Sequence, residues 1–165
     1  MTKLNEIAET FEILGDWEQR YQYLIEIGEK LPDMPTELKT DSNKVHECMS
    51  QVWISPYTLA EKPNKIHFYG DCDSSIIKGV LALLIQLVDN KTSDEIQKLN
   101  IDEIFNRLNL AEHLSPNRHV GIYAIVNIMK NQASKFESSS TAPRKNKAIM
   151  ATDQKSRFDD VSFMP

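Results

Sequence analysis

The chain has 165 residues, of which 19 are Lys or Arg and 24 are Asp or Glu, so its formal net charge is −5. This acidic balance argues against a protein that coats nucleic acid or an anionic membrane, because neutralising phosphates requires clustered Lys and Arg. Two cysteines are too few for a disulfide framework or a four-cysteine zinc site.

No apolar run reaches the ~18–20 residues of a membrane span. Residues 1–10 carry Asn and Glu where a signal peptide needs its apolar stretch. We therefore expect a soluble, cytoplasmic protein in a reducing environment, and its two thiols, Cys48 and Cys72, need an explanation.

The first part of the chain predicts two helices. Apolar residues within 4–14 recur at the spacing of one buried helix face. Asp16 with Gln19 has the pattern of a capping box that opens a second helix, which ends near residues 28–32. Two prolines within 31–35 then predict a loop, because proline removes a backbone donor and biases the residue before it away from helix.

The middle of the chain changes to a strand pattern. Residues 52–57 and 65–69 are rich in β-branched and aromatic side chains, and the polar residues 61–64 between them predict a hairpin turn. Residues 43–46 are expected to add a short third strand. The sequence therefore predicts a small antiparallel sheet of about three strands.

Helical signals return after the sheet. Residues 73–75 are suited to cap the run 76–88, which is apolar on nearly every side and is expected to be the central buried helix. Three later pairs have the pattern of helix starts: Thr92 with Glu95, Asn100 with Glu103, and Ser115 with Pro116. The order of helices, small sheet and helices predicts an α+β fold.

Composition divides the chain near Lys135. The thirty residues after it hold five basic and four acidic side chains, seven Ser or Thr, and no hydrophobic periodicity. Such a segment cannot bury enough apolar area to offset the entropy of ordering it. We therefore expect one folded domain at 1–135, with a charge of −6, and a disordered polar tail at 136–165.

Cys48 stands out by its position between the proline-containing loop and the first strand. Reactive groups are often presented on loops of a rigid scaffold, and a thiolate there is able to attack an electrophilic sulfur or carbon. His46 would point to the same side of an extended segment, so a thiol enzyme with a base–nucleophile pair stays open. An inert cysteine in a binding module is the third interpretation.

Cys72 lies just before the central helix. The helix start lowers its pKa and the flanking aspartates raise it, so we interpret it as a structural or incidental cysteine. A Cys48–Cys72 disulfide is geometrically feasible, but no secretion signal supports one. A zinc site formed by both cysteines with His46 and His67 is disfavoured, because their spacing differs from Cys-x-x-Cys.

Four segments together resemble the SufE family of sulfur-acceptor proteins, which partner cysteine desulfurases in iron–sulfur cluster assembly. The segments are 17–21 with 28–32, 43–54, 70–79, and 113–118 with Gly121. They occur in the family's order and near its spacing. A cysteine followed by Ser-x-Val-Trp, with a later Asp before Ile-x-Lys-Gly, is a specific combination.

The resemblance implies that Cys48 accepts persulfide sulfur from a SufS-like, pyridoxal phosphate-dependent cysteine desulfurase, stimulates it, and passes the sulfur to a SufBCD-like scaffold complex. It implies a carrier and activator rather than an enzyme with its own turnover, and no resident cofactor or metal. A close paralogue serving another desulfurase is the alternative. The implied fold is α+β with a curved antiparallel sheet and the cysteine at a loop tip.

Five further residues match family positions that support this loop or face the desulfurase: Ser50, Gln51, Trp53, Asp73 and Arg118. We add the hypothesis that Arg118 favours the Cys48 thiolate. Two positions depart from the family pattern. Glu47 stands where glycine is usual, so its side chain restricts positive φ and its charge disfavours a thiolate. Cys72 stands where serine is usual, and we interpret it as a substitution rather than a resolving thiol.

Overall fold

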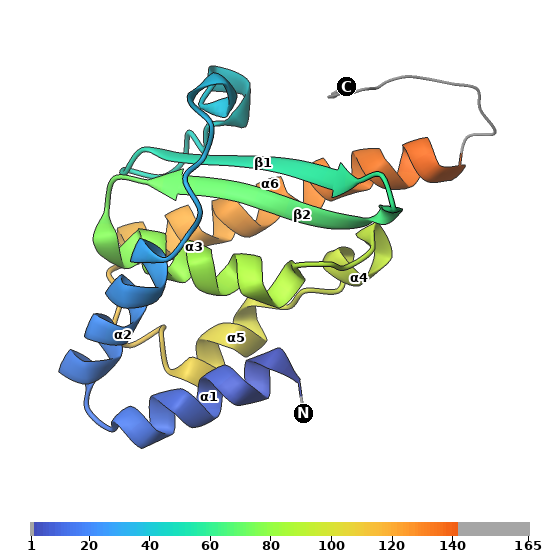
Figure 1. The fold of residues 1–165 in the computed structure, drawn as a ribbon. Coiled ribbons are helices and arrows are strands. Elements are labelled where there is room, and N and C mark those ends of the chain that lie inside the picture. Colours follow the sequence, from blue (N-terminus) through green and yellow to red (C-terminus); the bar gives the residue numbers. More distant parts are fainter. Residues whose placement is uncertain (1, 142–165) are drawn as a thin grey trace.

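The computed structural model describes residues 2–141, and in this range it has an α+β fold, as predicted (Figure 1). In chain order the elements are α1 (Lys3–Leu14), α2 (Trp17–Glu29), the 3₁₀ helices η1 (Thr36–Leu38) and η2 (Asp41–Asn43), β1 (Val52–Leu59), β2 (Lys62–Cys72), α3 (Ser75–Val88), α4 (Ser93–Gln97), α5 (Ile101–Leu108) and α6 (Pro116–Thr141). No helix within the described range is both long and apolar enough to cross a membrane.

Helix α6 continues past Lys135, where the sequence analysis places the domain boundary, to Thr141. The remainder of the segment predicted as a tail, residues 142–165, lies outside the described residues.

Side chains cap the helices where the sequence places caps. The Asp16 carboxylate accepts a hydrogen bond from the backbone N–H of Gln19 (2.9 Å) at the start of α2, and Thr92 with Glu95 forms a reciprocal capping box on α4. Ser74 is the N-cap of α3. Because Ser74 takes that role, the carboxylate of Asp73 is available for a different contact, described below.

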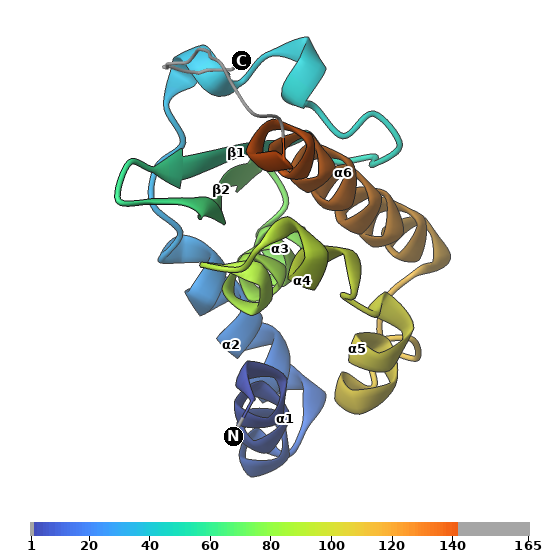
Figure 2. The ribbon, with the colours of Figure 1, turned by 90° about the vertical axis from the view of Figure 1, so that its right-hand side faces the viewer.

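Helix α3 is the central helix, as its apolar sequence predicts. Figure 2 shows it in the middle of the fold, with the hairpin and α6 on one side and α1, α2 and α5 on the other. Gly79 brings α2 against it, since a Cβ at Gly79 would overlap the backbone carbonyl of Leu24. Gly70 brings β2 against it in the same way, because a Cβ there would lie 2.9 Å from side-chain atoms of Leu81 and Ile85.

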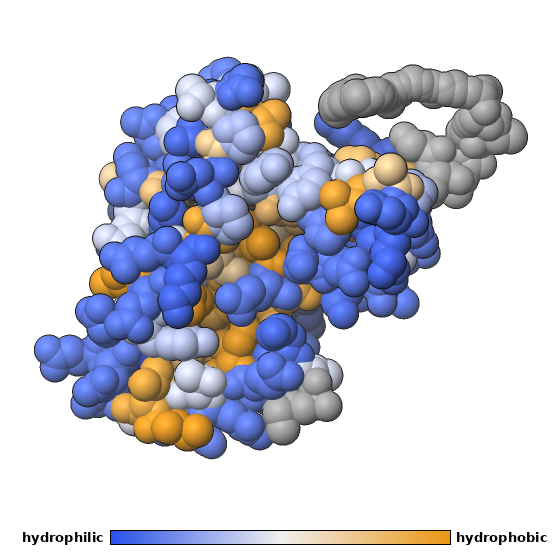
Figure 3. All heavy atoms as spheres, in the orientation of Figure 1, coloured by the Kyte–Doolittle hydropathy of each residue, from blue (hydrophilic) through white to orange (hydrophobic). Residues whose placement is uncertain are grey.

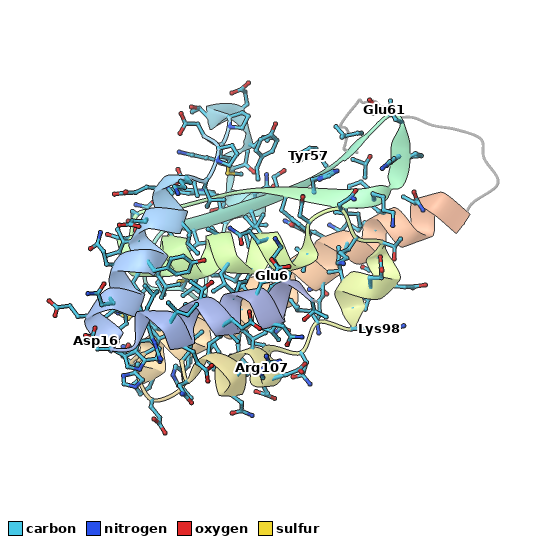
Figure 4. All side chains as sticks on the ribbon, turned by 60° about the horizontal axis from the view of Figure 1, so that its bottom comes forward. Glu6, Asp16, Tyr57, Glu61, Lys98 and Arg107 are labelled. Atoms are coloured by element: carbon cyan, nitrogen blue, oxygen red, sulfur yellow. The ribbon has the colours of Figure 1, made fainter. Side chains whose placement is uncertain are left out.

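The surface around this core is mostly polar. In Figure 3 hydrophilic side chains cover most of the visible face, and apolar side chains show in its middle and at its lower left edge. At the base of the fold, Arg107 of α5 reaches α1 and donates a hydrogen bond to the side-chain oxygen of Asn5 (2.7 Å), and Figure 4 shows Arg107 beside α1.

The sheet differs from the prediction in its number of strands. β1 and β2 pair antiparallel, with Val52 opposite Cys72, but residues 43–46 do not form a third strand. Instead η2 ends at Asn43 and Lys44 makes a single bridge to Trp53. Pairing stops there because the backbone turns back on itself and joins Val45 to Val52 by a hydrogen bond of 2.8 Å.

The hairpin turn is also tighter than predicted. The strands extend to Leu59 and begin again at Lys62, with a register shift after Thr58. Part of the polar stretch 61–64 therefore belongs to β2 rather than to the turn. Pro63 is tolerated there because the irregularity removes the need for a regular ladder donor.

We expect the substitution Gly79→Ala to destabilise the fold. Alanine in place of glycine in an exposed helix interior stabilises by about 1 kcal/mol, but here the added methyl meets the backbone of Leu24. Overpacking of this kind costs typically about 1–3 kcal/mol. The free energy of unfolding, measured by urea denaturation, should therefore fall by about 1–3 kcal/mol.

Ser75→Ala is the matched control, because Ser75 is exposed at the start of the same helix. It should change the unfolding free energy by no more than about 0.5 kcal/mol. A Gly79→Ala protein as stable as the original would show that α2 and α3 do not approach as closely as described.

Candidate functional site

Cys48 lies in a loop, residues 45–52, that is fixed at its base; we call it the cysteine loop. The N–H of Val45 donates to the carbonyl of Val52 (2.8 Å). Gln51 and Asp73 are joined twice: the Gln51 N–H donates to the Asp73 carboxylate (3.0 Å), and the Asp73 N–H donates to the Gln51 carbonyl (3.1 Å). This Gln51–Asp73 clamp ties the loop to the segment that leads into α3.

The tip of the cysteine loop places its thiol against α6. A Cβ added at Gly121 would lie 2.7 Å from Sγ of Cys48, so glycine is the residue that leaves room for the sulfur. Cys48 is half-buried and packs on the main apolar cluster, while its neighbour Met49 is 82% exposed. The tip therefore shelters one side chain and presents the next to solvent.

The surroundings of Cys48 disfavour its thiolate. Burial raises the pKa of the Cys48 thiol, a hydrogen bond from the Ser50 N–H lowers it, and the carboxylate of Asp73 raises it. Together these effects raise the pKa of Cys48. At neutral pH the resting thiol is therefore mainly protonated, and exposure of the loop tip removes the largest of these effects.

Three of the residues expected to support the loop do surround Cys48. The backbone N–H of Ser50 lowers the pKa of Cys48, and Gln51 and Asp73 form the clamp. Trp53 does not face Cys48. Its side chain lies on one face of the hairpin, and that of the buried Val52 lies on the other.

On that opposite face a small charged cluster holds the start of the hairpin. The ammonium of Lys39 lies 5.6 Å from the centre of the Trp53 ring and 2.6 Å from the carboxylate of Asp71, which Lys78 also contacts at 3.3 Å. The lysines lower the pKa of the Asp71 carboxyl even though burial acts in the other direction. Sequence reasoning missed this cluster, since nothing in the pattern around Lys39 places it near the sheet.

Arg118 is exposed in the first turn of α6, where its N–H donates to the hydroxyl oxygen of Ser115 (3.4 Å). It precedes Gly121 by three residues and so lies on the same side of the helix. It is not among the groups that shift the pKa of Cys48. The resting conformation therefore gives no support to a thiolate stabilised by Arg118, and a role of Arg118 toward a partner stays a prediction.

The imidazole of His46 and the backbone of Glu47 can both be compared with what the sequence led us to expect. The ring Nε2 of His46 lies 3.1 Å from the carbonyl oxygen of Asp41, so the imidazole is engaged away from the thiol and no base–nucleophile pair forms with Cys48. Among the described residues other than glycine, positive φ occurs at Asn90 and Asn109, not at Glu47. Glu47 therefore has a backbone conformation that any side chain tolerates, and an effect of this departure from glycine on the loop stays a prediction.

An open groove of about 640 Å³ runs along α6 beside the cysteine loop. Glu47 lines it from the loop, and the other lining residues lie on α6: His119, Val120, Tyr123, Ala124, Asn127, Ile128 and Asn131. Val120 and Tyr123 are large hydrophobic side chains left exposed. Their helical spacing is also that of a core-facing stripe, which is why the sequence did not identify the groove.

The described residues contain no group of three or more His, Cys, Asp or Glu side chains arranged to hold a metal ion. The groups at the site are the Cys48 thiol and the backbone and carboxylate groups around it. A thiol of this kind is able to attack sulfur or carbon electrophiles once it is exposed and deprotonated.

Comparisons with known proteins show a family match and several similar chains. Residues 5–133 match the family described as "SufE: Fe-S metabolism associated domain". The chain is 38% identical over 119 residues to the sulfur acceptor protein CsdE of Escherichia coli (strain K12), covering 72% of this chain and 80% of that protein. It is 35% identical over 131 residues to the cysteine desulfuration protein SufE of Wigglesworthia glossinidia brevipalpis, covering 79% and 89%.

Among solved structures, the solution structure of a hypothetical protein from Thermus thermophilus has the same fold. The TM-score is 0.68 at 22% sequence identity, and the match covers 84% of this chain and 99% of the other.

We expect Gly121→Ala to expose the thiol of Cys48. The new methyl would lie 2.7 Å from Sγ, so the loop tip must leave α6. Loss of burial lowers the pKa, and the rate of alkylation at pH 7 rises about tenfold for each unit by which the pKa falls. Iodoacetamide labelling followed by peptide mass analysis measures this rate.

Asn117→Ala, an exposed change on the same helix, is the control for Gly121→Ala and should leave the labelling rate unchanged. Equal labelling rates in the Gly121→Ala protein and the original would mean that the thiol does not rest against α6.

We expect Asp73→Asn to shift the pH profile of Cys48 alkylation to lower pH. The carboxylate of Asp73 raises the pKa of Cys48, so removing its charge favours the thiolate, while the amide oxygen of Asn still accepts from Gln51. Glu47→Gln removes a charge from a residue next to Cys48 that does not shift its pKa, and this control should leave the profile in place. A profile unchanged by Asp73→Asn would refute the electrostatic account of the thiol.

Proposed function

The chain belongs to the SufE family, and on this premise we propose that it is a sulfur-acceptor protein that takes persulfide sulfur from a cysteine desulfurase onto Cys48. One observation carries the proposal: a half-buried thiol at the tip of a loop whose base is held by the Gln51–Asp73 clamp. Relatives named as a sulfur acceptor and as a cysteine desulfuration protein support it.

The transfer is a thiol–disulfide type exchange. The Cys48 thiolate attacks the outer sulfur of a persulfide on the desulfurase, the sulfur–sulfur bond of that persulfide breaks, and the desulfurase cysteine leaves as a thiolate. Cys48 then holds one extra sulfur atom. No net oxidation occurs, so the step needs no cofactor on this chain, and the pyridoxal phosphate chemistry that generates the persulfide belongs to the desulfurase.

The contact of the Cys48 sulfur with Gly121 and the fixed loop base fit a carrier whose thiol alternates between two positions. Against Gly121 the sulfur is half-buried, which limits access of stray reductants. In the partner's site the tip moves outward, and the thiol loses the burial that raises its pKa. The clamp keeps the ends of the loop in place, so the movement stays local, like that of a small lid.

The surface beside the cysteine loop offers a docking area for the desulfurase. Met49 at the loop tip and Val120 and Tyr123 in the α6 groove are exposed hydrophobic side chains, and Arg118 is exposed one turn before Gly121. Removal of sulfur from the desulfurase persulfide accounts for stimulation of that enzyme. A SufBCD-like scaffold complex is the recipient of the sulfur in this proposal, and the cytoplasm, where thiols stay reduced, is its location.

The identity values do not separate two desulfurase pathways, because the CsdE and SufE relatives match at 38% and 35%. A pull-down of desulfurases with the reduced full-length chain identifies the partner. The alternative of a thiol enzyme loses its support, since the imidazole of His46 is engaged with Asp41.

We expect the reduced protein to gain one sulfur atom when it is incubated with a cysteine desulfurase and cysteine. Intact mass measured at early times should show the gain on the original chain, because Cys48 is the nucleophile in this proposal. Cys48→Ser should abolish it. Cys72→Ser is the matched control, which removes the other thiol and should still gain the sulfur. A Cys48→Ser protein that still gains sulfur, or an original chain that never does, would overturn the proposal.

A further inference from the structure

The two cysteines face the same side of the hairpin. Cys72 ends β2 opposite Val52, is 7% exposed, and shares its face with Gly70, which packs on α3. Tyr57 lies on the other face of the hairpin, away from α3 (Figure 4). The sulfur of Cys48 reaches that inner side from the loop, since it rests on α6 and packs on the same apolar cluster that contains Cys72.

Each partner of the Gln51–Asp73 clamp lies close to one of the two cysteines in the sequence. Gln51 is three residues after Cys48, and Asp73 follows Cys72 directly, so the two hydrogen bonds of the clamp hold both cysteine-bearing segments side by side. The Cys72 sulfur accepts a hydrogen bond from the N–H of Ser74, two residues later (3.4 Å). The N–H of Ser50, two residues after Cys48, lowers the pKa of Cys48. The two thiols therefore sit in similar turns that flank one clamp.

Electrostatics agrees with this placement. A charge on Cys48 raises the pKa of Cys72, and the carboxylate of Asp73 raises the pKa of both cysteines. Coulombic effects grow as the distance between the groups falls and as burial lowers the dielectric, which is consistent with the placement by the clamp. The interpretation of Cys72 as an incidental cysteine did not anticipate this arrangement, because the clamp is a contact between segments 22 residues apart.

We propose that Cys72 is a resolving thiol, which discharges the persulfide on Cys48 as hydrosulfide and leaves a Cys48–Cys72 disulfide when no recipient takes the sulfur. The inference rests on the proposed function, since a persulfide on Cys48 is its starting point.

The chemistry balances without an external oxidant. The Cys72 thiolate attacks Sγ of Cys48, the bond between that Sγ and the outer sulfur breaks, and the outer sulfur leaves with the bonding electrons as hydrosulfide. The outer sulfur gains two electrons, and the sulfurs of Cys48 and Cys72 together lose two in forming the disulfide. The proton of the Cys72 thiol goes to solvent, and a dithiol reductant restores both thiols.

The same surroundings make the discharge slow. The pKa of Cys72 is raised to about 11 by burial, the largest cause, and by Cys48, Asp73 and Asp71, while a hydrogen bond from the Ser74 N–H lowers it. Lys39 and Lys78 pair with Asp71 and offset part of its charge. Near pH 7 about one Cys72 in ten thousand is ionised. Transfer of the sulfur to a recipient is therefore faster than attack by Cys72. The discharge removes only sulfur that no recipient has taken.

The test compares reduced wild-type protein with Cys72→Ser, both loaded by a cysteine desulfurase with cysteine and then desalted without reductant. In the wild type we expect the extra sulfur to disappear, the mass to fall two hydrogens below the reduced chain, and one hydrosulfide to appear per disulfide. Peptide mapping should join Cys48 to Cys72. The Cys72→Ser protein should hold its sulfur about tenfold longer or more, since it lacks the attacking thiolate.

Raising the pH from 7 to 9 should speed the wild-type discharge by about tenfold per unit, because the Cys72 thiolate fraction grows in that proportion below its pKa. Circular dichroism of Cys72→Ser and of a second variant, Cys72→Ala, checks that the loss of the thiol does not unfold the protein. The disulfide-linked peptide is measured on the wild type and so does not depend on any variant.

The outcomes separate this inference from the function on which it rests. If wild type and Cys72→Ser both gain sulfur and hold it equally long, or if the extra sulfur is found on the Cys72 peptide, the resolving role is overturned and the acceptor role stands. If neither protein ever gains sulfur, both fail.

Discussion

The clamp between Gln51 and Asp73 is the contact on which the rest of the site depends. One of its bonds runs from a backbone N–H to a carboxylate, the stronger, charge-assisted kind, and the other joins two backbone groups. Together they hold the start of β1 against the segment that enters α3. In the proposed transfer, the loop tip moves while these hydrogen bonds keep the hairpin and the central helix in place.

Asp73 affects Cys48 in two ways, through its hydrogen bonds and through its charge. Its hydrogen bonds position the loop, while its negative charge raises the pKa of the Cys48 thiol. A carrier benefits from both, since a thiol that is protonated at rest reacts little with stray electrophiles. In the proposed transfer, the thiol becomes reactive when the tip leaves Gly121 and loses the burial that raises its pKa. In the proposed carrier, the groups that hold the sulfur are therefore the same groups that control when it reacts.

The sequence predicted the parts of this protein that follow from local pattern. Helix caps such as Asp16 and Thr92 and the buried run of α3 depend on neighbouring residues, so they are readable from the chain. The clamp, the packing of Cys48 on Gly121 and the cluster around Lys39 join distant segments, and no spacing rule reveals them. The prediction of a third strand was wrong for the same reason, because the hydrogen bond between Val45 and Val52 that turns the chain is a tertiary contact.

The central claim, a fixed loop base with a movable tip, is tested most directly by native-state hydrogen exchange at single amides. The amides of Gln51 and Asp73 should be protected, exchanging about a hundredfold or more slowly than those of Glu47 and Met49 at the tip. If the Gln51 amide exchanges as fast as the amides at the tip, the clamp does not hold the loop and the account is contradicted.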